Sequence, residues 1–326
     1  MFGKSTVFAV AATVATSFSV AQACETTPAP ETLDGGWSLV WSDEFNGDAI
    51  DPEKWSHEVD CWGGGNDERQ CYVPWPENSF VKDGCLSIVA RLEGAAGPAW
   101  PESMRDNEGI DPNETKEQPF TSARLRTKNK AEWTYGRIEA RAKVPTGQGL
   151  WSAIWMLPTD EVYGDWALSG EIDIMEAVNI GTECRGCPKR KENTIFGTIH
   201  YGGVWPNNSY ESKKGKLPKS DDPSHGFNVY AVEWSEGRIE WFLNGKSYGK
   251  VTSRTWSPLF GGRGGNRNAP FDQAFHLILN LAVGGNLAEN KNEGGVTLLD
   301  FPKALEIDWV RVYQCSEDET AKACTR

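Results

Sequence analysis

Short runs of alternating apolar and polar residues recur along the chain, separated by Gly, Pro, Asn and Asp. Beyond the N-terminal segment we find no long stripe of apolar residues at helical spacing. Many strands without intervening helices predict antiparallel sheets that form a sandwich or a barrel, so the fold class is all-β. Asn244-Gly245 predicts a tight hairpin turn. The clearest strand candidates are residues 86–92, 136–144, 194–201, 227–234, 238–243, 275–281 and 305–313.

The pattern indicates one domain, framed by a first strand at residues 37–41 and a last strand at 305–313. No internal repeat and no Pro/Ser/Thr-rich linker divides it. Residues 93–119 are rich in Pro, Gly and acidic residues, and predict a long surface loop. The predicted divisions are a signal peptide at 1–23, a short leader at 24–35, a single domain at 36–315 and a C-terminal tail at 316–326.

The N-terminus is typical of a secretory signal. Lys4 supplies a positive charge, residues 7–20 are apolar or small, and Ala21-Gln22-Ala23 forms a cleavage site before Cys24. We therefore expect a secreted protein, extracellular or periplasmic. A cysteine directly after the cleavage site is also typical of a lipid-anchored protein. However, Ala21 stands where the lipid-anchor signal usually has Leu, which favours ordinary secretion.

All eight cysteines follow the predicted signal peptide, and an even count in an exported chain predicts disulfides. Cys184 and Cys187 have the spacing of a redox or zinc pair. No second pair of this spacing exists and export places the chain in an oxidising compartment, so we favour a loop disulfide.

Charge and hydropathy exclude some partners. The chain has 33 Lys and Arg against 46 Asp and Glu, a net charge of −13, and no basic run, which argues against nucleic acid. No apolar stretch after the N-terminus approaches the length of a membrane span. The 15 Trp outnumber the 13 Phe, which suits stacking on sugars but also suits a large β-core.

The sharpest chemical signal is Ser-Gly-Glu-Ile-Asp-Ile-Met-Glu at residues 169–176. Alternation puts Glu171 and Asp173 on one face of a strand, while the isoleucines after them point to the other. Strict alternation would turn Glu176 toward the apolar side, where an unpaired carboxylate is costly. One extra residue, a β-bulge at Met175, would return Glu176 to the acidic face.

Three carboxyl groups so close together cannot all ionise freely, so one should keep its proton near neutral pH while another stays anionic. Glycoside hydrolysis uses one carboxylic acid and one carboxylate in this way. Two other interpretations fit the same residues: ligands for a metal such as Ca²⁺, or the solvated face of a strand. The residues alone leave the three interpretations open.

At this motif the chain resembles glycoside hydrolase family 16, and within it the bacterial laminarinase type of endo-β-1,3-glucanase. The resemblance rests on Glu171-Ile-Asp173-Ile-Met-Glu176, the bulged ExDxxE form, and on residues 149–158, 198–208, 277–286 and 307–313. It covers residues 37–314. It implies a β-jelly-roll sandwich of two curved antiparallel sheets, with a substrate cleft along the concave face.

The resemblance implies a role for each acid. By position, Glu171 matches the nucleophile, Glu176 the acid/base, and Asp173 the acid between them, which hydrogen-bonds the nucleophile and tunes its ionisation. Ser152 and Ala167 depart from the family pattern, which frequently has Pro at both places. These departures concern local loop shape rather than the chemistry.

The resemblance also implies residues that contact the sugar. The tryptophans would stack on sugar rings, although core packing is the alternative. The histidine would lie near Glu176, where a structural hydrogen bond is the alternative. The remaining two would contact sugar hydroxyls or anchor loops. These six residues are Trp151, Trp155, Trp166, His200, Asn78 and Arg124.

A structural calcium ion away from the chemistry is a further implication of the resemblance, and no catalytic cofactor is expected. The matched ligands are the Asp308 side chain and the backbone carbonyls of Glu44 and Gly84. Hard oxygen ligands fit Ca²⁺. The alternative for Asp308 is a hydrogen bond to a neighbouring strand.

Two functions from different classes remain: an endo-hydrolase, or a non-catalytic glucan-binding protein on the same scaffold. Glu171 and Glu176 are both present, which favours the hydrolase. The expected substrate is a laminarin-type β-1,3-glucan, cut with retention of configuration by a monomer. Mixed-linkage β-1,3-1,4-glucanase or agarase-like activity is the alternative. The unbulged ExDxE, typical of lichenases and xyloglucan transferases, is absent.

Overall fold

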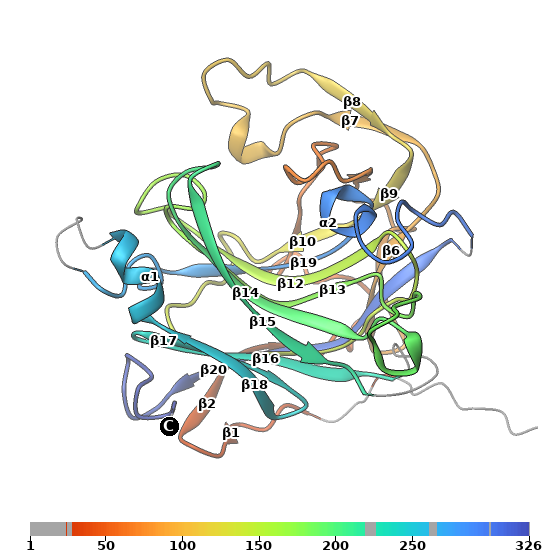
Figure 1. The fold of residues 1–326 in the computed structure, drawn as a ribbon. Helices are drawn as coiled ribbons and strands as arrows, with labels where there is room; N and C mark the ends of the chain where they lie inside the picture. The colour runs from red at the N-terminus through yellow and green to blue at the C-terminus, as the bar shows by residue number, and fades with distance from the viewer. Residues whose placement is uncertain (1–23, 25–27, 219–225, 261–265, 300, 326) are drawn as a thin grey trace, which may run out of the picture.

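Two large antiparallel sheets pack face to face and form a sandwich (Figure 1). This computed structural model describes residue 24 and residues 28–218, 226–260, 266–299 and 301–325. The predicted all-β jelly-roll is confirmed: the helices in the described part of the chain are short, and strands form both layers. The predicted signal peptide, residues 1–23, lies outside the described residues.

The seven-stranded sheet carries the acidic motif. Its central strands, β12 and β13, have a core on one side and partly exposed residues on the other, and they therefore alternate in burial. In spatial order its strands are β15 (Asn208–Lys216), β14 (Thr194–Gly202), β13 (Glu171–Val178), β12 (Leu150–Pro158), β19 (Phe275–Val283), β10 (Arg124–Arg126) and β3 (Ser56–His57).

The nine-stranded sheet forms the second layer. The predicted hairpin turn at Asn244-Gly245 is confirmed, since it joins two antiparallel strands of this sheet. The main path is β1 (Thr32–Leu33), β2 (Trp37–Asp43), β20 (Lys303–Cys315), β11 (Gly136–Lys143), β16 (Asn228–Ser235), β17 (Arg238–Leu243) and β18 (Lys246–Thr252), and β5 (Ser79–Lys82) and β6 (Cys85–Ala90) join it at β20.

The main core lies between the two sheets. Ile154 and Ile172 from one sheet and Val310, Trp234 and Trp241 from the other are fully buried there. Burial of such side chains contributes about 1.5–3 kcal/mol each and holds the layers together. The two Trp indoles still need hydrogen-bond acceptors in this core, and each has one.

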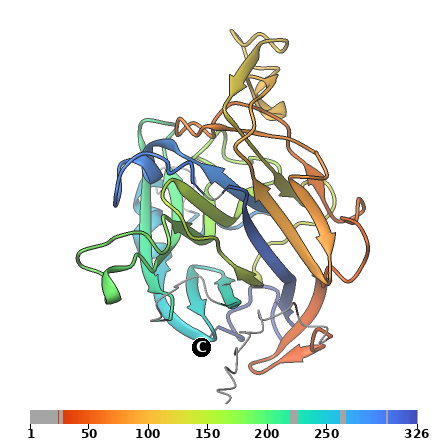
Figure 2. The ribbon, with the colours of Figure 1, turned by 90° about the vertical axis from the view of Figure 1, so that its right-hand side faces the viewer.

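Residues 93–119, predicted as a long surface loop, instead form a hairpin of their own. Strands β7 (Ala95–Pro98) and β8 (Thr115–Gln118) pair, and the 3-10 helix η1 (Glu102–Met104) lies between them. The sequence did not indicate that the Cys61–Cys71 disulfide lies beside this segment. The sulfur of Cys71 contacts the backbone carbonyl of Ala95 on β7. The hairpin projects beyond the two sheets on the side away from the nine-stranded layer (Figures 1 and 2).

Smaller elements complete the chain. Strands β4 (Gln70–Tyr72) and β9 (Phe120–Ser122) form a short parallel pair. Helices α1 (Ser253–Phe260) and α2 (Gly285–Glu289) and the 3-10 helix η2 (Pro188–Arg190) lie in connections. In the described part of the chain, none of the helices is long and apolar enough to span a membrane.

All eight cysteines form disulfides, and the predicted loop disulfide Cys184–Cys187 is one of them. Two others tie the chain ends to the domain: Cys24–Cys85 joins the leader to β6, and Cys315–Cys324 closes the C-terminal tail. The leader also contributes β1 to the nine-stranded sheet. Both segments therefore pack on the domain.

Candidate active site

A β-bulge in β13 brings all three acids to one face of the seven-stranded sheet. Against β12, Asp173 pairs with Trp155 and Met175 pairs with Ile154, so Ile174 has no opposite residue. Ile174 and Met175 are both buried in the core, although they are consecutive. The predicted bulge is confirmed, and its extra residue in the register with β12 is Ile174, one position before Met175.

A core tryptophan supports this bulge from the opposite sheet. The indole N–H of Trp241 on β17 donates to the backbone carbonyl of Asp173 over 2.8 Å. Gly197 on β14 makes room for it, since a Cβ there would lie 2.3 Å from the Trp241 ring. Because bulges leave backbone groups without ladder partners, this bond satisfies one of them.

Glu171 and Asp173 lie beside a histidine. On the neighbouring strand β14, His200 pairs with Glu171, and its Nε2 lies 3.7 Å from Oε1 of Glu171 and 3.5 Å from Oδ2 of Asp173. Asp173 is buried, whereas Glu171 and His200 are partly exposed. His200 therefore lies on the acidic face, but its nearest carboxylates are Glu171 and Asp173 rather than Glu176, beside which it was expected.

Burial and mutual repulsion change the ionisation of this cluster. Burial, followed by the charges of Glu171 and Glu176, raises the pKa of Asp173 well above its usual range. Burial also raises the pKa of Glu176, and the Glu171 charge adds to this, while His200 opposes it. For His200, burial alone would lower the pKa, but the three carboxylates raise it to about 10. The site can therefore hold a protonated imidazole and a protonated carboxyl near neutral pH.

Glu176 accepts hydrogen bonds from two neighbouring strands. The indole N–H of Trp151 on β12 donates to its Oε1 over 3.1 Å, and the hydroxyl of Thr198 on β14 donates to its Oε2 over 3.3 Å. Trp151 thus lies on the acidic face and contacts the acid directly, which the core-packing alternative does not describe. These two donors orient the Glu176 carboxyl.

A row of aromatic rings extends from Glu171. The indole N–H of Trp166 donates to Oε2 of Glu171 over 2.7 Å. The ring centroid of His200 lies 5.6 Å from that of Trp166 and 5.8 Å from that of Tyr210. Trp166 and Tyr210 are 37% and 68% exposed, so their faces are open to a ligand. Flat exposed rings beside carboxylates suit a sugar chain.

Trp155 is held on the other side of the acids. Its indole N–H donates to Oδ1 of Asn280 on β19 over 2.7 Å, and the guanidinium of Arg124 lies 5.5 Å from its ring centroid. Arg124 is buried, lies over the ring of Tyr72 and forms an ion pair with Glu58 over 3.6 Å. Arg124 therefore packs against the ring of Trp155.

Asn78 lies apart from the acids. Its side chain is fully buried, and its amide donates to the carbonyl of Val89 and to the hydroxyl of Thr121. This is the arrangement of a loop anchor, which was the alternative for this residue. Of the six positions expected to contact the sugar, the structure brings four together beside the acids: Trp151, Trp155, Trp166 and His200.

Among the predicted calcium ligands, Asp308 is the one that would bind by its side chain, while Glu44 and Gly84 would bind by backbone carbonyls, which the side-chain contacts of Glu44 do not test. Asp308 is fully buried on β20, and the guanidinium of Arg141 on β11 forms an ion pair with its Oδ2. The Glu44 side chain pairs with Arg311. A hydrogen-bonded partner on a neighbouring strand was the alternative for Asp308, and Arg141 is that partner. Since Arg141 already neutralises the carboxylate, these residues fit a calcium ion poorly, and calcium stays a prediction.

A metal at the acids is the other interpretation of the cluster. Ligand atoms of Glu171, Asp173 and His200 lie within 4.8 Å of one another. However, the indole N–H of Trp166 donates to Glu171, and the imidazole lies at ion-pairing distance from Asp173. A raised pKa on His200 opposes metal binding as well, because a protonated imidazole cannot be a ligand.

Sequence reasoning missed two polar residues of the site. Thr198 could have been predicted from the sequence, because it lies two residues before His200 on the same strand and hence on the same face. Asn280 was marked only by being, with His276, one of two polar residues in a largely apolar strand. Its role as the acceptor for Trp155 depends on a pairing between distant strands that the sequence does not specify.

Comparison with known proteins agrees with this geometry. The sequence profile described as "Beta-porphyranase A-D, GH16 domain" matches residues 37–315. This chain belongs to glycoside hydrolase family 16. The resemblance seen in the sequence is thereby confirmed, and the protein is a glycoside hydrolase.

Individual relatives of this family 16 hydrolase cover most of its length. It is 39% identical to the β-glucanase of Rhodothermus marinus, with 86% of each chain covered. It is also 39% identical to glucan endo-1,3-β-glucosidase A1 of Niallia circulans, but spans only 38% of that longer protein. The X-ray structure of the laminarinase from Rhodothermus marinus superposes with a TM-score of 0.67 at 37% identity, over 85% of this chain and 97% of that one.

Proposed function

We propose that this protein is a secreted endo-hydrolase that cleaves β-1,3-glucosidic bonds in laminarin-type β-glucans. The observation that carries the proposal is the bulge that gathers Glu171, Asp173 and Glu176 on one partly exposed sheet face. Aromatic rings flank these acids on both sides. Laminarinases among the relatives support the β-1,3 linkage.

The proposed reaction is a double displacement. Glu171 attacks the anomeric carbon and forms a covalent glycosyl ester, while Glu176 donates its proton to the departing glycosidic oxygen. The ionised Glu176 then takes a proton from water, and the oxygen of that water attacks the anomeric carbon of the ester, so that the bond to Glu171 breaks and its carboxylate is released. The configuration is retained because it is inverted twice. The raised pKa of Glu176 supports its role as the first-step acid.

Asp173 and His200 act on the nucleophile rather than on the substrate. The imidazole lies between the two carboxylates, and its raised pKa keeps a positive charge there. That charge lies 3.7 Å from Oε1 of Glu171, the carboxylate that attacks. Trp166 holds one oxygen of the same carboxylate by its indole N–H.

Export of the chain is part of the proposal. Four disulfides support an oxidising compartment. Cys24 is bonded to Cys85, and a sulfur in a disulfide cannot also carry a lipid, so we favour a secreted protein over a lipid-anchored one.

Substrate assays test the linkage. Release of reducing sugar from laminarin, lichenan, agarose and porphyran should be measured side by side, with Glu171→Gln as the inactive control. We expect laminarin to be cut fastest. The β-porphyranase profile makes a galactan the second candidate, so activity on agarose or porphyran alone would overturn the β-1,3-glucan assignment.

A further inference from the structure

Two lysine side chains lie over one aromatic ring on the same sheet face as the acids. The ring is that of Phe196, which is partly exposed on β14. Its centroid lies 4.7 Å from Nζ of Lys291 and 5.8 Å from Nζ of Lys214. Phe196 pairs with Glu176 on one side and with Lys214 on the other. Paired residues of neighbouring strands point to the same face, so Glu176, Phe196 and Lys214 form a row across the sheet.

Neither of these two ammonium groups forms an ion pair with a described carboxylate, although the charges of Glu176 and Glu192 act on Lys291 from a longer distance. Among the described residues, no carboxylate lies within ion-pairing distance of Lys214 or Lys291, whereas Lys213 on the same strand pairs with Glu211. The chain as a whole carries a net charge of −13. Two unpaired cations beside the acid/base of such an acidic protein indicate a ligand that supplies the missing negative charge.

The backbone that presents Lys291 is firmly held. Its carbonyl accepts hydrogen bonds from the Gln148 and Asn179 side-chain amides and from the amide of Gly294. The next residue, Asn292, accepts from the Asn179 amide over 3.2 Å and donates to Oε2 of Glu192 over 3.3 Å.

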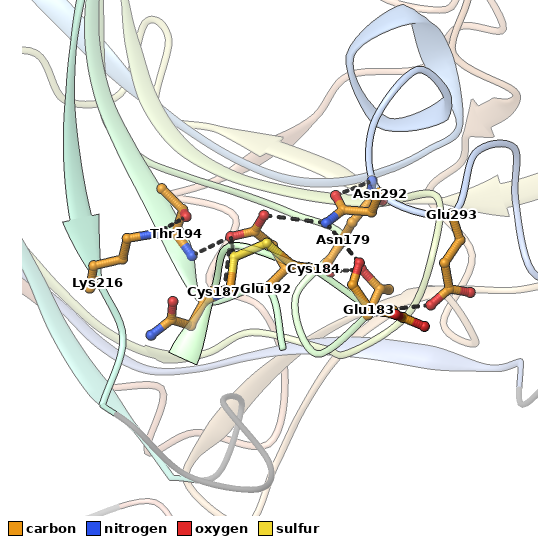
Figure 3. Close-up of a disulfide and its surroundings, with 11 residues drawn as sticks. Asn179, Glu183, Cys184, Cys187, Glu192, Thr194, Lys216, Asn292 and Glu293 are labelled. Carbon is orange, nitrogen blue, oxygen red and sulfur yellow. Dashed lines mark hydrogen bonds between the residues drawn. A yellow bond between two sulfur atoms is a disulfide. The ribbon is translucent and has the colours of Figure 1, made fainter. Parts of the chain in front are cut away.

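Glu192 in turn belongs to the connection between β13 and β14, residues 179–193, which also carries the Cys184–Cys187 disulfide and which we call the disulfide loop (Figure 3). One oxygen of Glu192 accepts from the backbone amides of Asn193 and Thr194 at the start of β14. This disulfide loop therefore connects the strand that carries Phe196 with the segment that carries Lys291. Phe196 and the backbone of Lys291 are therefore fixed relative to one another.

We propose that Phe196, Lys214 and Lys291 form a subsite for a sugar residue that bears an anionic substituent. The apolar face of the sugar would lie on the Phe196 ring, and the two ammonium groups would donate hydrogen bonds to the oxygens of a sulfate ester or a carboxylate. The subsite lies next to Glu176, so it would select the substituted residue close to the bond that is cut.

This inference rests on the proposed function only in that the ligand is a glycan bound along the acidic face; it does not depend on the β-1,3 linkage. The alternative is that the lysines merely cover Phe196 by cation–π contact. That alternative predicts no preference for charged substrates.

The test compares laminarin with chemically sulfated laminarin and with carboxymethylated laminarin. The measured quantity is the ratio of kcat/KM on each charged substrate to kcat/KM on neutral laminarin. In the Lys214→Gln/Lys291→Gln double variant we expect this ratio to fall about tenfold, since two charge-assisted hydrogen bonds are lost. The substrate whose ratio falls more, sulfated or carboxymethylated, identifies the anion.

Lys213→Gln is the matched control, because it removes the same charge from the opposite face of the same strand. It should leave the ratio unchanged. Lys291→Arg should keep most of the ratio, since the cation remains. Equal ratios in the wild type and the double variant would overturn the subsite, as would an equal fall in Lys213→Gln.

A binding measurement separates this inference from the proposed function. Native gels cast with laminarin or with sulfated laminarin should retard the wild type more strongly in the sulfated gel, and the double variant should lose that difference. If no β-glucan is hydrolysed, the proposed function fails while the gel still decides the subsite. If laminarin is hydrolysed but the gels show no difference, only the subsite fails.

Discussion

The indole N–H of Trp166 donates a hydrogen bond to Oε2 of Glu171 over 2.7 Å, while Oε1 of the same carboxylate faces His200. One oxygen of Glu171 is thereby held by a neutral donor, and the other lies beside a cation. Trp166 is 37% exposed, so its ring can contact a sugar while its N–H orients the carboxylate. Binding and positioning of the nucleophile are combined in one side chain.

Replacing Trp166 with Phe should separate these two roles. The ring remains, but Glu171 loses its donor, so we expect kcat on laminarin to fall about tenfold with a smaller change in KM. Trp205→Phe is the control, because Trp205 is 73% exposed and removal of its indole N–H should have no such effect. A kcat unchanged in Trp166→Phe would show that the hydrogen bond does not orient the nucleophile.

Azide should distinguish the two glutamates. With an aryl β-glucoside substrate of low leaving-group pKa, Glu176→Ala still forms the glycosyl ester at Glu171, and azide then displaces that ester to give a β-glycosyl azide. In Glu171→Ala, azide attacks the sugar directly from the other face and gives the α-product. Proton NMR of the products measures the configuration. The reverse pattern would exchange the two assignments.

Some of this site was predictable because the residues break a local pattern. Glu176 falls on the core side of a strictly alternating strand, and the cost of burying a carboxylate there predicts a bulge. The spacing of the three acids allowed glycoside hydrolysis as one of three interpretations, and the family resemblance favoured it over the other two. What the sequence could not specify is which partner each acid has. The hydrogen bond from Trp151 to Glu176 depends on the register between β12 and β13. In this register Trp151 pairs with Val178, which lies two residues after Glu176.

Predictions failed or stayed open where distant segments decide the outcome. Residues 93–119 form a hairpin because the Cys61–Cys71 segment packs beside it, and cysteine spacing does not give connectivity. Asn78 is a buried anchor because two other strands supply its acceptors. The extra residue of the bulge is Ile174 in the register with β12, whereas Ile174 and the predicted Met175 together face Gly197 in the register with β14. Alternation fixes the face of a side chain but not its cross-strand partner.

His200 should make stability depend on pH. Its pKa is raised from 6.5 to about 10, so its proton stabilises the fold fully below about pH 6.5, and this contribution is lost as the pH rises through about 10. The gap in unfolding free energy between wild type and His200→Gln should therefore be largest near pH 6. We expect it to shrink by roughly 2–4 kcal/mol toward pH 10.

His276 provides the control for this titration. Burial, with Lys128 and Arg126, lowers its pKa to about 3, so it stays neutral throughout that range. Thermal or urea unfolding of His276→Gln should show a gap from wild type that does not change between pH 6 and pH 10. A constant gap for His200→Gln would mean that His200 is not protonated in the folded state.

Calcium removal tests the environment of Asp308. Because Arg141 already pairs with this buried carboxylate, we expect EDTA to leave the melting temperature unchanged. Asp308→Asn should destabilise the fold by about 3–5 kcal/mol, since it removes the carboxylate charge that faces the buried Arg141 guanidinium. A melting temperature that rises with added Ca²⁺ in the wild type, and not in Asp308→Asn, would instead establish the calcium site that the family resemblance implies.

The bulge should depend on a tryptophan from the opposite sheet. Trp241→Phe removes the N–H that reaches the carbonyl of Asp173 and leaves that buried acceptor without its partner. We expect a loss of stability of about 1–3 kcal/mol. Because the same carbonyl belongs to the bulge that turns Glu176 to the acidic face, kcat should fall as well.

Trp234→Phe is the matched control for this last change. Trp234 is as fully buried as Trp241 and also donates its indole N–H to a backbone carbonyl, that of Phe271, which lies outside β13. Both variants should lower the melting temperature by similar amounts, but only Trp241→Phe should reduce kcat on laminarin when both are assayed well below their melting temperatures. Equal loss of kcat would indicate a general effect of core damage. Unchanged kcat in Trp241→Phe would show that β12 and β14 hold the bulge without help from the opposite sheet.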